Sequence, residues 1–330
     1  MNETYYLFSN GDLKRKDNVI RLTTPDKRFK DIKIETTKDI YLFGEISLNT
    51  KCLNYLGQLG ISLHIFNYYG FYTGSFYPKE SNISGRLLVN QVKFYDDPDK
   101  RVYLAQRFIE GASHNIKRNL AYYKRREKEV GEQLEEIKYL ETLIEKCITV
   151  EELMGIEGNI RKQYYKAWNT IVDQKIDFEK RVKRPPDNMI NTLISFINTL
   201  IYTTCLGEIY KTQLNPTISY LHVPGTRRFS LCLDLSEIFK PLIADRMIFS
   251  LLNKNIITEK DFSQGSNFYY LGDKGKKKIL MEFDKRMNKT IKHKDLGRDI
   301  SYRHLIKLEC YKLIKHLMND KKYEPFKIWW

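Results

Sequence analysis

The chain has 330 residues, enough for one large domain or two of ordinary size with a full apolar core. Its 56 Lys and Arg residues exceed its 41 Asp and Glu residues by 15, and a net charge of +15 indicates a polyanionic partner, either nucleic acid or an anionic membrane. The five cysteines are scattered without a C-x-x-C pair, which argues against a disulfide framework or a structural zinc site and favours a reducing compartment.

Residues 1–85 are predicted to form a small β-domain. The YYLF run, Asn10-Gly11 and LKRKDNVIRL are interpreted as a hairpin, because Asn-Gly supplies the positive φ angles of a tight type I′ turn. DIKIE, DIYLFGEISL and GISLHIFN are short runs rich in residues that strands prefer. Glycines interrupt the aromatic run NYYGFYTGSFYP, which predicts another hairpin. Seven or so strands of this kind predict a small sandwich or twisted sheet, and not a parallel α/β unit.

Residues 86–330 are predicted to form a larger, all-helical domain, so the fold class is α+β. Apolar residues recur at helical spacing over much of this region, and Thr149 with Glu152 forms a T-x-x-E capping box that starts a new helix. A helix after residue 234 is expected to kink near Pro241. The predicted helices lie at 86–110, at 124–147, from Pro185-Pro186 to about Tyr210, at 234–253 and at 302–318.

Neither a secretory signal nor a membrane span is expected. The first residues, MNETYYLFSNGD, lack a basic region followed by an apolar stretch. Residues 188–206 carry no charge, but Asn, Ser and Thr side chains interrupt them and leave a low apolar density for ~20 residues of hydrocarbon. We therefore expect a helix buried in a large domain, and a soluble, cytoplasmic protein without a membrane partner.

The stretch from Leu214 to Arg246 gathers groups that could hold a divalent metal against a phosphate. It contains His222, Asp234, Glu237 and Asp245. Asp234 and Glu237 are three residues apart in a predicted helix, so both project from one face. Carboxylates combined with an imidazole suit Mn²⁺ well and Mg²⁺ acceptably.

Cations accompany these acids. Arg227 and Arg228 lie in the loop after His222, where they could neutralise a scissile phosphate, and Lys240 follows Glu237 by one helical turn. This is the composition expected for metal-assisted phosphodiester chemistry. The segment GIEGNIRKQYY adds Glu157, between two glycines that allow backbone or substrate to approach closely.

From the residues alone, structural interpretations stay open beside the catalytic one. A D-x-x-E pair such as Asp234 and Glu237 is most often a solvated helix face. A lone histidine such as His222 is more often a structural hydrogen-bonding group than a ligand. For Glu157, the residues alone favour an exposed position in a simple connection between two helices. What favours a site is the convergence of the histidine, the acids and the arginines in one short stretch.

The chain also carries basic clusters, with aromatic residues near some of them, that predict a surface able to follow a phosphate backbone. Its ending, PFKIWW, places Phe326, Trp329 and Trp330 on a charged tail. Aromatic side chains of this kind dock on the core of their own chain or on a partner. Of the other histidines, His64 is expected to be structural, and His114, His293, His304 and His316 to contact nucleic acid or lie on the surface.

Two segments together, GIEGNIRKQYY and LHVPGTRRFSLCLDLSEIFKPLIADR, resemble the CRISPR-associated integrase of spacer acquisition, the first-numbered Cas protein. The resemblance runs over the whole chain: the N-terminal part is similar to that family's β-domain, and the rest is similar to its helical catalytic domain. The PFKIWW ending is similar to versions found in type I-B systems.

The resemblance implies a metal-dependent DNA endonuclease and integrase whose ligands for Mg²⁺ or Mn²⁺ are Glu157, His222 and Glu237, with Asp234 as an auxiliary acid. Before the histidine the family usually has an Asp-Pro pair and a glycine, where this chain has Asn215-Pro216 and Ile218-Ser219. That difference affects the shape of the loop more than the ligands.

The implied reaction inserts captured foreign DNA as new spacers into a CRISPR array, by attack of a 3′-hydroxyl on a repeat phosphodiester, in antiviral defence. The implied partners are double-stranded and branched DNA, a second copy of the chain through the β-domain, and a small ferredoxin-like second Cas subunit. Two other functions remain compatible with the residues. One is a metal-dependent nuclease that cuts branched DNA in repair, and the other is a non-catalytic scaffold that binds DNA.

Overall fold

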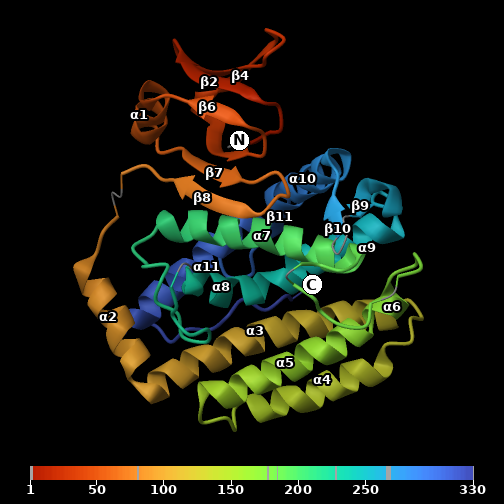
Figure 1. The fold of residues 1–330 in the computed structure, drawn as a ribbon. Helices are drawn as coiled ribbons and strands as arrows, with labels where there is room; N and C mark the ends of the chain where they lie inside the picture. Colours follow the sequence, from red (N-terminus) through yellow and green to blue (C-terminus); the bar gives the residue numbers. More distant parts are fainter. Residues whose placement is uncertain are drawn as a thin grey trace. The chain divides into compact units, whose positions relative to one another are not determined.

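The computed structural model describes residues 3–79, 82–176, 178–183, 185–226, 229–264 and 269–329. The chain divides into two compact units, Met1–Ser81 and Asn82–Trp330 (Figure 1). The first is built from β-strands and the second is rich in helices, so the predicted α+β fold class is confirmed. The boundary lies a few residues before the predicted one, because Ser84 already belongs to the helical unit, where its side chain caps the first helix by accepting a hydrogen bond from the Leu87 amide.

The N-terminal unit contains two four-stranded sheets with a common core. One sheet has the order β1-β5-β7-β8 and the other β4-β3-β2-β6. Leu7, Leu42 and Leu63 of the first sheet and Leu13 and Ile20 of the second belong to one buried cluster. The strands are β1 (Glu3–Leu7), β2 (Gly11–Lys16), β3 (Val19–Thr23), β4 (Phe29–Lys33), β5 (Thr37–Leu42), β6 (Ile46–Leu48), β7 (Ser62–Phe66) and β8 (Tyr72–Phe76).

The hairpin predicted at Asn10-Gly11 is wrong. Strand β1 pairs in parallel with β5, and the tight hairpin joins β2 to β3 through Asp17, which adopts a φ of 52°. Asn10 and Gly11 instead lead the chain from one sheet to the other. The Asn10 side chain accepts a hydrogen bond from the Glu45 amide at 2.9 Å, and a Cβ at Gly11 would lie 2.1 Å from the Thr23 carbonyl oxygen.

The other N-terminal predictions had mixed outcomes. The hairpin in the aromatic run is confirmed, since β7 and β8 pair antiparallel and Gly70 lies between them with a φ of 86°. Parallel pairing was not expected, yet β1–β5, β5–β7 and β2–β6 are all parallel. Helix α1 (Thr50–Gln58) was not predicted either; it begins where the Asn49 side chain accepts a hydrogen bond from the Cys52 amide. A short 3₁₀ turn, η1 (Ile34–Thr36), precedes β5.

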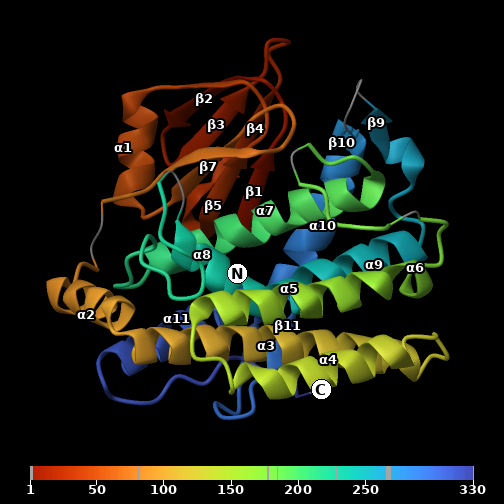
Figure 2. The ribbon, with the colours of Figure 1, turned by 60° about the horizontal axis from the view of Figure 1, so that its bottom comes forward.

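In the C-terminal unit, helices α3, α4 and α5 lie side by side (Figures 1 and 2), and α8 packs against both α3 and α7. Two short ribbons that were not predicted, β9–β10 and β11–β12, join the later helices. The elements are α2 (Gly85–Asp96), α3 (Pro98–Lys124), α4 (Gly131–Ile144), α5 (Val150–Lys166), α6 (Trp168–Ile171), α7 (Met189–Tyr210), α8 (Ser230–Lys240), η2 (Pro241–Asp245), α9 (Arg246–Asn253), η3 (Glu259–Asp261), β9 (Phe262–Gln264), β10 (Tyr269–Leu271), α10 (Asp273–Asn288), β11 (Thr290–Lys292), β12 (Asp299–Ser301) and α11 (Tyr302–Leu317).

Local capping signals fix where two of these helices begin. The predicted capping box is present at the start of α5, where Thr149 and Glu152 each satisfy the other's backbone amide. Helix α7 begins at Met189, later than predicted, because Asn188 caps it by accepting from the Asn191 amide. Helix α7 is long and apolar enough to cross a membrane, but 78% of its most apolar window is buried inside the unit, as expected of a core helix.

The predicted kink at Pro241 takes the form of a π-helical turn, η2, between α8 and α9. Proline has no backbone N–H, so the regular hydrogen-bond ladder is interrupted there. Two buried asparagines on α3 bond carbonyls at this turn: Asn115 donates to the Ile238 carbonyl at 2.9 Å, and Asn119 donates to the Pro241 carbonyl at 2.8 Å. These bonds hold the C-terminal end of α8 against α3, and α8 is the helix that carries Asp234 and Glu237.

Candidate functional site

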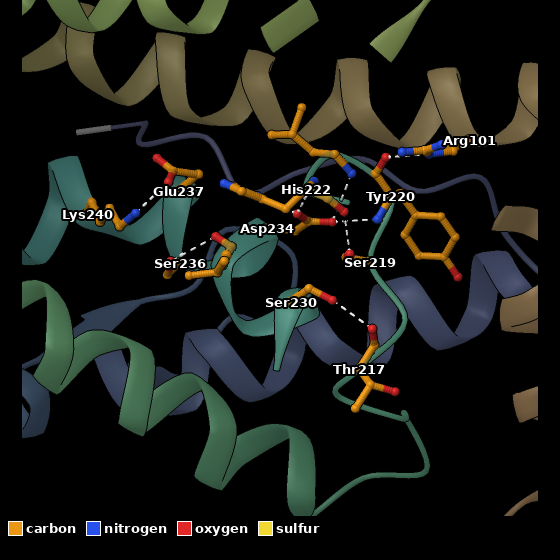
Figure 3. A network of polar contacts seen from close by, with 12 residues as sticks. Arg101, Thr217, Ser219, Tyr220, His222, Ser230, Asp234, Ser236, Glu237 and Lys240 are labelled. Atoms are coloured by element: carbon orange, nitrogen blue, oxygen red, sulfur yellow. Dashed lines mark hydrogen bonds and ion pairs between the residues drawn. The ribbon is translucent and has the colours of Figure 1, made fainter. Parts of the chain in front are cut away.

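Asp234 organises the loop that precedes α8. Its carboxylate is fully buried and accepts backbone hydrogen bonds from Tyr220 at 2.7 Å, Leu221 at 3.0 Å and His222 at 3.0 Å. Figure 3 shows these contacts converging on one side chain. Arg101 of α3 donates to the Tyr220 carbonyl at 3.1 Å and holds the same loop from the other side. The auxiliary acid of the sequence analysis is therefore the anchor of the histidine loop.

The same carboxylate orients the imidazole of His222. Nδ1 of His222 lies 2.8 Å from Oδ1 of Asp234, and the ring remains partly exposed. Because a carboxylate accepts, Nδ1 carries the proton in the neutral ring, and Nε2 keeps its lone pair for another partner. Burial lowers the pKa of His222, but the hydrogen bond and charge of Asp234 outweigh it, so the pKa lies above its usual value.

Glu237, one helical turn after Asp234, is held between two cations. Lys240 donates to its Oε1 and Arg161 of α5 donates to its Oε2 (the Lys240 contact is drawn in Figure 3). Burial alone would raise the pKa of this carboxyl. The charges of Lys240 and Arg161 reverse that effect and place the pKa well below its usual range. Glu237 is therefore ionised at neutral pH although its side chain is almost completely buried.

Glu157 lies inside helix α5 and not in a connection between helices, so the simple-connection interpretation is wrong. Its Oε1 accepts a hydrogen bond at 3.2 Å from Nε of Arg161, one turn further along α5. The other side of the same guanidinium contacts Glu237. Arg161 thus brings together two of the acids that the sequence analysis singled out in separate segments.

A third acid, Asp245 at the end of η2, faces the same guanidinium. Its Oδ2 lies 3.9 Å from Nη1 of Arg161. Burial raises the pKa of Asp245 to about 7, and the charges of Arg161 and Lys240 only partly oppose that rise. The long distance and the raised pKa distinguish this carboxyl from Glu237, which is paired closely and ionised.

Sequence reasoning missed two cations of this site. Arg161 was quoted within GIEGNIRKQYY but not singled out, although its position four residues after Glu157 puts both on one helix face. Lys183 lies close enough for its charge to interact with Lys240, Glu237 and Glu157. The predicted phosphate-binding residues Arg227 and Arg228 lie outside the described residues.

Among the described residues, no three His, Cys, Asp or Glu side chains are grouped closely enough to hold a metal ion as they stand. The donor types are nevertheless those of a hard-metal site, since two carboxylates contact one guanidinium and a neighbouring imidazole interacts electrostatically with Glu237. The positive charge that balances these carboxylates is supplied by Arg161 and Lys240.

The C-terminal tail docks on the core of its own chain and packs against α8, the helix that carries Asp234 and Glu237. Phe326 stacks on Phe239 of α8 with ring centroids 5.9 Å apart. Asn115, which bonds the Ile238 carbonyl, also accepts a hydrogen bond from the Ile328 amide at 2.9 Å. The histidines here are structural: His114 bonds the Ile328 carbonyl and His316 accepts from the Tyr323 amide. Trp330 lies outside the described residues.

A glutamate paired with two cations, an imidazole oriented by a buried aspartate and a strongly basic chain are the composition expected of proteins that act on phosphodiesters. The comparisons with known proteins place it more closely. Residues 5–285 match the family model of the CRISPR-associated protein Cas1. The chain is 59% identical over 330 residues to the CRISPR-associated endonuclease Cas1 of Fusobacterium nucleatum subsp. nucleatum, covering all of this chain and 98% of that protein. The chain therefore belongs to the Cas1 family.

Solved structures agree with this assignment. The Cas1 protein of Thermotoga maritima superposes with a TM-score of 0.87 at 39% identity, covering 98% of this chain and 99% of that one. A casposase bound to its integration product superposes with a TM-score of 0.89 over 99% of this chain and 93% of that one. At 22% identity, the casposase shows a shared fold.

Proposed function

We propose that the protein is a metal-dependent DNA endonuclease and integrase that inserts captured DNA as new spacers into a CRISPR array. The observation that carries this proposal is the meeting of Glu157 and Glu237 on one guanidinium, beside His222 held by Asp234. Membership of a family whose curated relatives are named endonucleases supports the nuclease activity. The fold shared with a casposase bound to an integration product agrees with strand transfer.

Glu157, Glu237 and Nε2 of His222 are the groups that would hold Mg²⁺ or Mn²⁺. All three carry lone pairs suited to these ions, and the two carboxylates already balance positive charge from Arg161. A metal held there would supply Lewis-acid chemistry, by polarising a non-bridging phosphate oxygen and stabilising the charge of an in-line displacement. Its binding requires Arg161 and Lys240 to give up part of their contact with Glu237.

The side chains around these ligands have separate tasks. Asp234 keeps the proton of His222 on Nδ1, so that Nε2 is available either to a metal or to a proton of the reacting groups. Lys240, once released from Glu237, and the neighbouring Lys183 neutralise the negative charge of the scissile phosphate. The nucleophile during integration is the 3′-hydroxyl of the captured DNA, and during nicking it is water.

The proposed partners follow from the family and from the charge of +15. They are double-stranded and branched DNA, a second copy of this chain joined through the β-sheet unit, and the small ferredoxin-like second Cas subunit. Such a complex would act in the cytoplasm, where the array lies, and five buried, free cysteines are compatible with a reducing compartment.

The test is an integration assay with the protein, the small Cas subunit, short duplex DNA and a supercoiled plasmid that carries a repeat. It is run with Mn²⁺, with Mg²⁺ and with EDTA, beside Glu157→Gln, which keeps the shape of the side chain and removes its charge. Metal-dependent joining that the variant loses supports the proposal. Cutting of branched DNA without joining would identify a repair nuclease instead, and binding without either reaction would identify a scaffold.

A further inference from the structure

A cavity of about 590 Å³ opens in the C-terminal unit, on a part of the surface that the proposed reaction does not use. Its walls come from α3, from the segment between β11 and β12, from α11 and from the C-terminal tail. Its lining contains none of Glu157, His222, Asp234, Glu237 and Asp245. The cavity is therefore a separate feature that requires its own explanation.

The lining is strongly positive. Seven Lys and Arg side chains face two carboxylates, Asp295 and Glu324. Some of these cations are balanced by the chain itself, as Lys312 is by Glu309 at 2.9 Å and Lys327 by Glu110 at 3.6 Å. Four others form no ion pair with any residue that the structure describes: Arg118, Lys294, Lys321 and Lys322. Cations that outnumber the carboxylates around a concave surface attract an anion with several charged groups.

An aromatic ring lies beside these cations. Trp329 lines the cavity and is 39% exposed. Its ring is held edge-on against His293 and Phe326, with centroid distances of 5.6 Å in both cases. Because Phe326 is itself anchored on α8, the tryptophan occupies a fixed position although it is close to the end of the chain. A supported, partly exposed ring is a platform on which a nucleic-acid base can stack.

We infer that this cavity binds a single strand of nucleic acid, with its phosphates on Lys321, Lys322 and Arg118 and a base on Trp329. Separate lysines match the spaced point charges of a phosphate backbone, and a stacking ring beside them is typical of sites for single strands. An acidic protein segment would also be drawn to the lysines, but it has no group that specifically requires the ring. The site is additional to the proposed strand-transfer site, because its lining shares no residue with the proposed ligands.

The inference is tested by fluorescence anisotropy with dye-labelled oligonucleotides of about 12 nucleotides, within the ~4–16 covered by one single-strand site. The full chain is titrated in EDTA, so that metal at the acids plays no part, with DNA and RNA versions in separate arms. The variants are Lys321→Ala with Lys322→Ala, and Trp329→Ala beside Trp329→Phe. The matched control, Lys254→Ala with Lys260→Ala, removes the same charge from exposed positions outside the cavity.

The double variant Lys321→Ala with Lys322→Ala is expected to reduce the magnitude of the slope of log affinity against log salt by about 1.4, because each single-strand phosphate contact contributes ~0.7. The control pair should leave the slope unchanged. Trp329→Ala should weaken binding about tenfold and Trp329→Phe should restore most of that loss, since one stacked base depends on the ring. Tighter binding of the DNA or the RNA arm identifies which strand the site prefers.

Location is checked by photo-crosslinking an oligonucleotide that contains 5-iodouracil, with a crosslink expected on the peptide that holds Trp329. The inference would be overturned if the double variant of Lys321 and Lys322 had the same salt slope as the control variant of Lys254 and Lys260. A second contrary result would be that polyglutamate displaces the labelled oligonucleotide as well as unlabelled oligonucleotide does, while Trp329→Ala binds with unchanged affinity. The cavity would then bind acidic protein segments. These binding measurements do not depend on Glu157 or on metal, so a negative result would not count against the strand-transfer proposal. Likewise, a failed integration assay would not count against binding in this cavity.

Discussion

Nδ1 of His222 lies 2.8 Å from Oδ1 of Asp234, and the same carboxylate also holds the backbone of the loop that carries the histidine. One buried acid thus decides both where the imidazole lies and which of its nitrogens is protonated. The position of this imidazole therefore depends on a residue that we do not expect to touch substrate.

Asp234→Asn should release the His222 ring from its partner without replacing any of the three proposed ligand residues. An asparagine has a single acceptor oxygen, so it cannot receive all four hydrogen bonds, from the amides of Tyr220, Leu221 and His222 and from Nδ1 of His222. We expect the free energy of unfolding to fall by about 1–3 kcal/mol for the unsatisfied groups, and strand transfer to be lost. Nitrogen NMR shifts of the His222 ring report which nitrogen carries the proton.

Asp173→Asn is the control for that variant, since Asp173 is an exposed acid paired with Lys128. It should change neither the tautomer of His222 nor strand transfer. An Asp234→Asn protein with the wild-type tautomer and full activity would show that the carboxylate does not position the ring.

Arg161→Met should destabilise the metal-free protein and increase its response to metal. Removing the guanidinium leaves Glu157, Glu237 and Asp245 close together without the cation they share. Breaking a buried ion pair on one side costs about 3–5 kcal/mol. Because the proposed metal replaces that charge, Mn²⁺ should raise the Tm of the variant more than that of the wild type.

Lys138→Met removes an exposed partner of Glu135 and serves as the control, with an expected change within ~1 kcal/mol and no altered response to Mn²⁺. If Mn²⁺ shifts the Tm of Arg161→Met and of the wild type equally, the metal does not bind the carboxylates that Arg161 contacts.

Two glycine substitutions are expected to change stability in opposite directions. A Cβ at Gly111 of α3 would lie 2.8 Å from Cβ of Pro325 and 3.3 Å from Cγ1 of Ile238, between the tail and the site helix. Gly111→Ala should therefore cost about 1–3 kcal/mol by overpacking. Gly155 of α5 has open space around the same position, so Gly155→Ala should stabilise the helix by about 0.5–1 kcal/mol. Denaturant unfolding measures both, and equal effects would contradict the packing of the tail against α3.

Mild acid should loosen the C-terminal tail. Burial lowers the pKa of His114, which bonds the Ile328 carbonyl, and also that of His316, whose Nδ1 accepts from the Tyr323 amide. Folded values below the unfolded one, near 6.5, mean that the unfolded chain binds more protons. The stability contribution is therefore present above that pH and is lost as the pH falls through the folded values. Protonation of His316 also removes the acceptor for Tyr323.

Hydrogen exchange of the Tyr323 and Ile328 amides between pH 7 and pH 5 measures this effect. The protection factors of these amides, which correct for the slower intrinsic exchange at low pH, are expected to be lower at pH 5 than at pH 7. In His316→Asn an uncharged acceptor replaces the ring, and the loss of protection at Tyr323 should be smaller. Identical protection at both pH values would exclude the two histidines as the cause.

Features that depend on neighbouring residues could be read from the sequence. The capping box of Thr149 and Glu152, the long apolar helix ending at Tyr210 and the disturbance at Pro241 were all predicted, because caps, apolar periodicity and a missing N–H act within a few residues. The two segments that resemble the family are also local, and the family they indicate is the one the chain belongs to.

Features that depend on pairing between distant segments could not be predicted from the sequence. Asn10-Gly11 has the composition of a tight turn, but whether β1 pairs with β2 or with β5 is decided by which sheet buries its side chains. Arg161 is one cation among many in the sequence. Its role emerges only when α5 and α8 pack together and place their acids on its two sides.

The sequence by itself determined the α+β class, the basic character, most helix positions and the candidate site residues. These features depend only on composition and on hydrogen bonds between residues close in sequence. Only the tertiary structure decided that Asp234 holds His222, that Arg161 joins Glu157 to Glu237, and that the tail forms one wall of a basic cavity. Charges and hydrogen bonds act over a few ångströms, and the distances between segments far apart in the chain are set by how their buried faces pack.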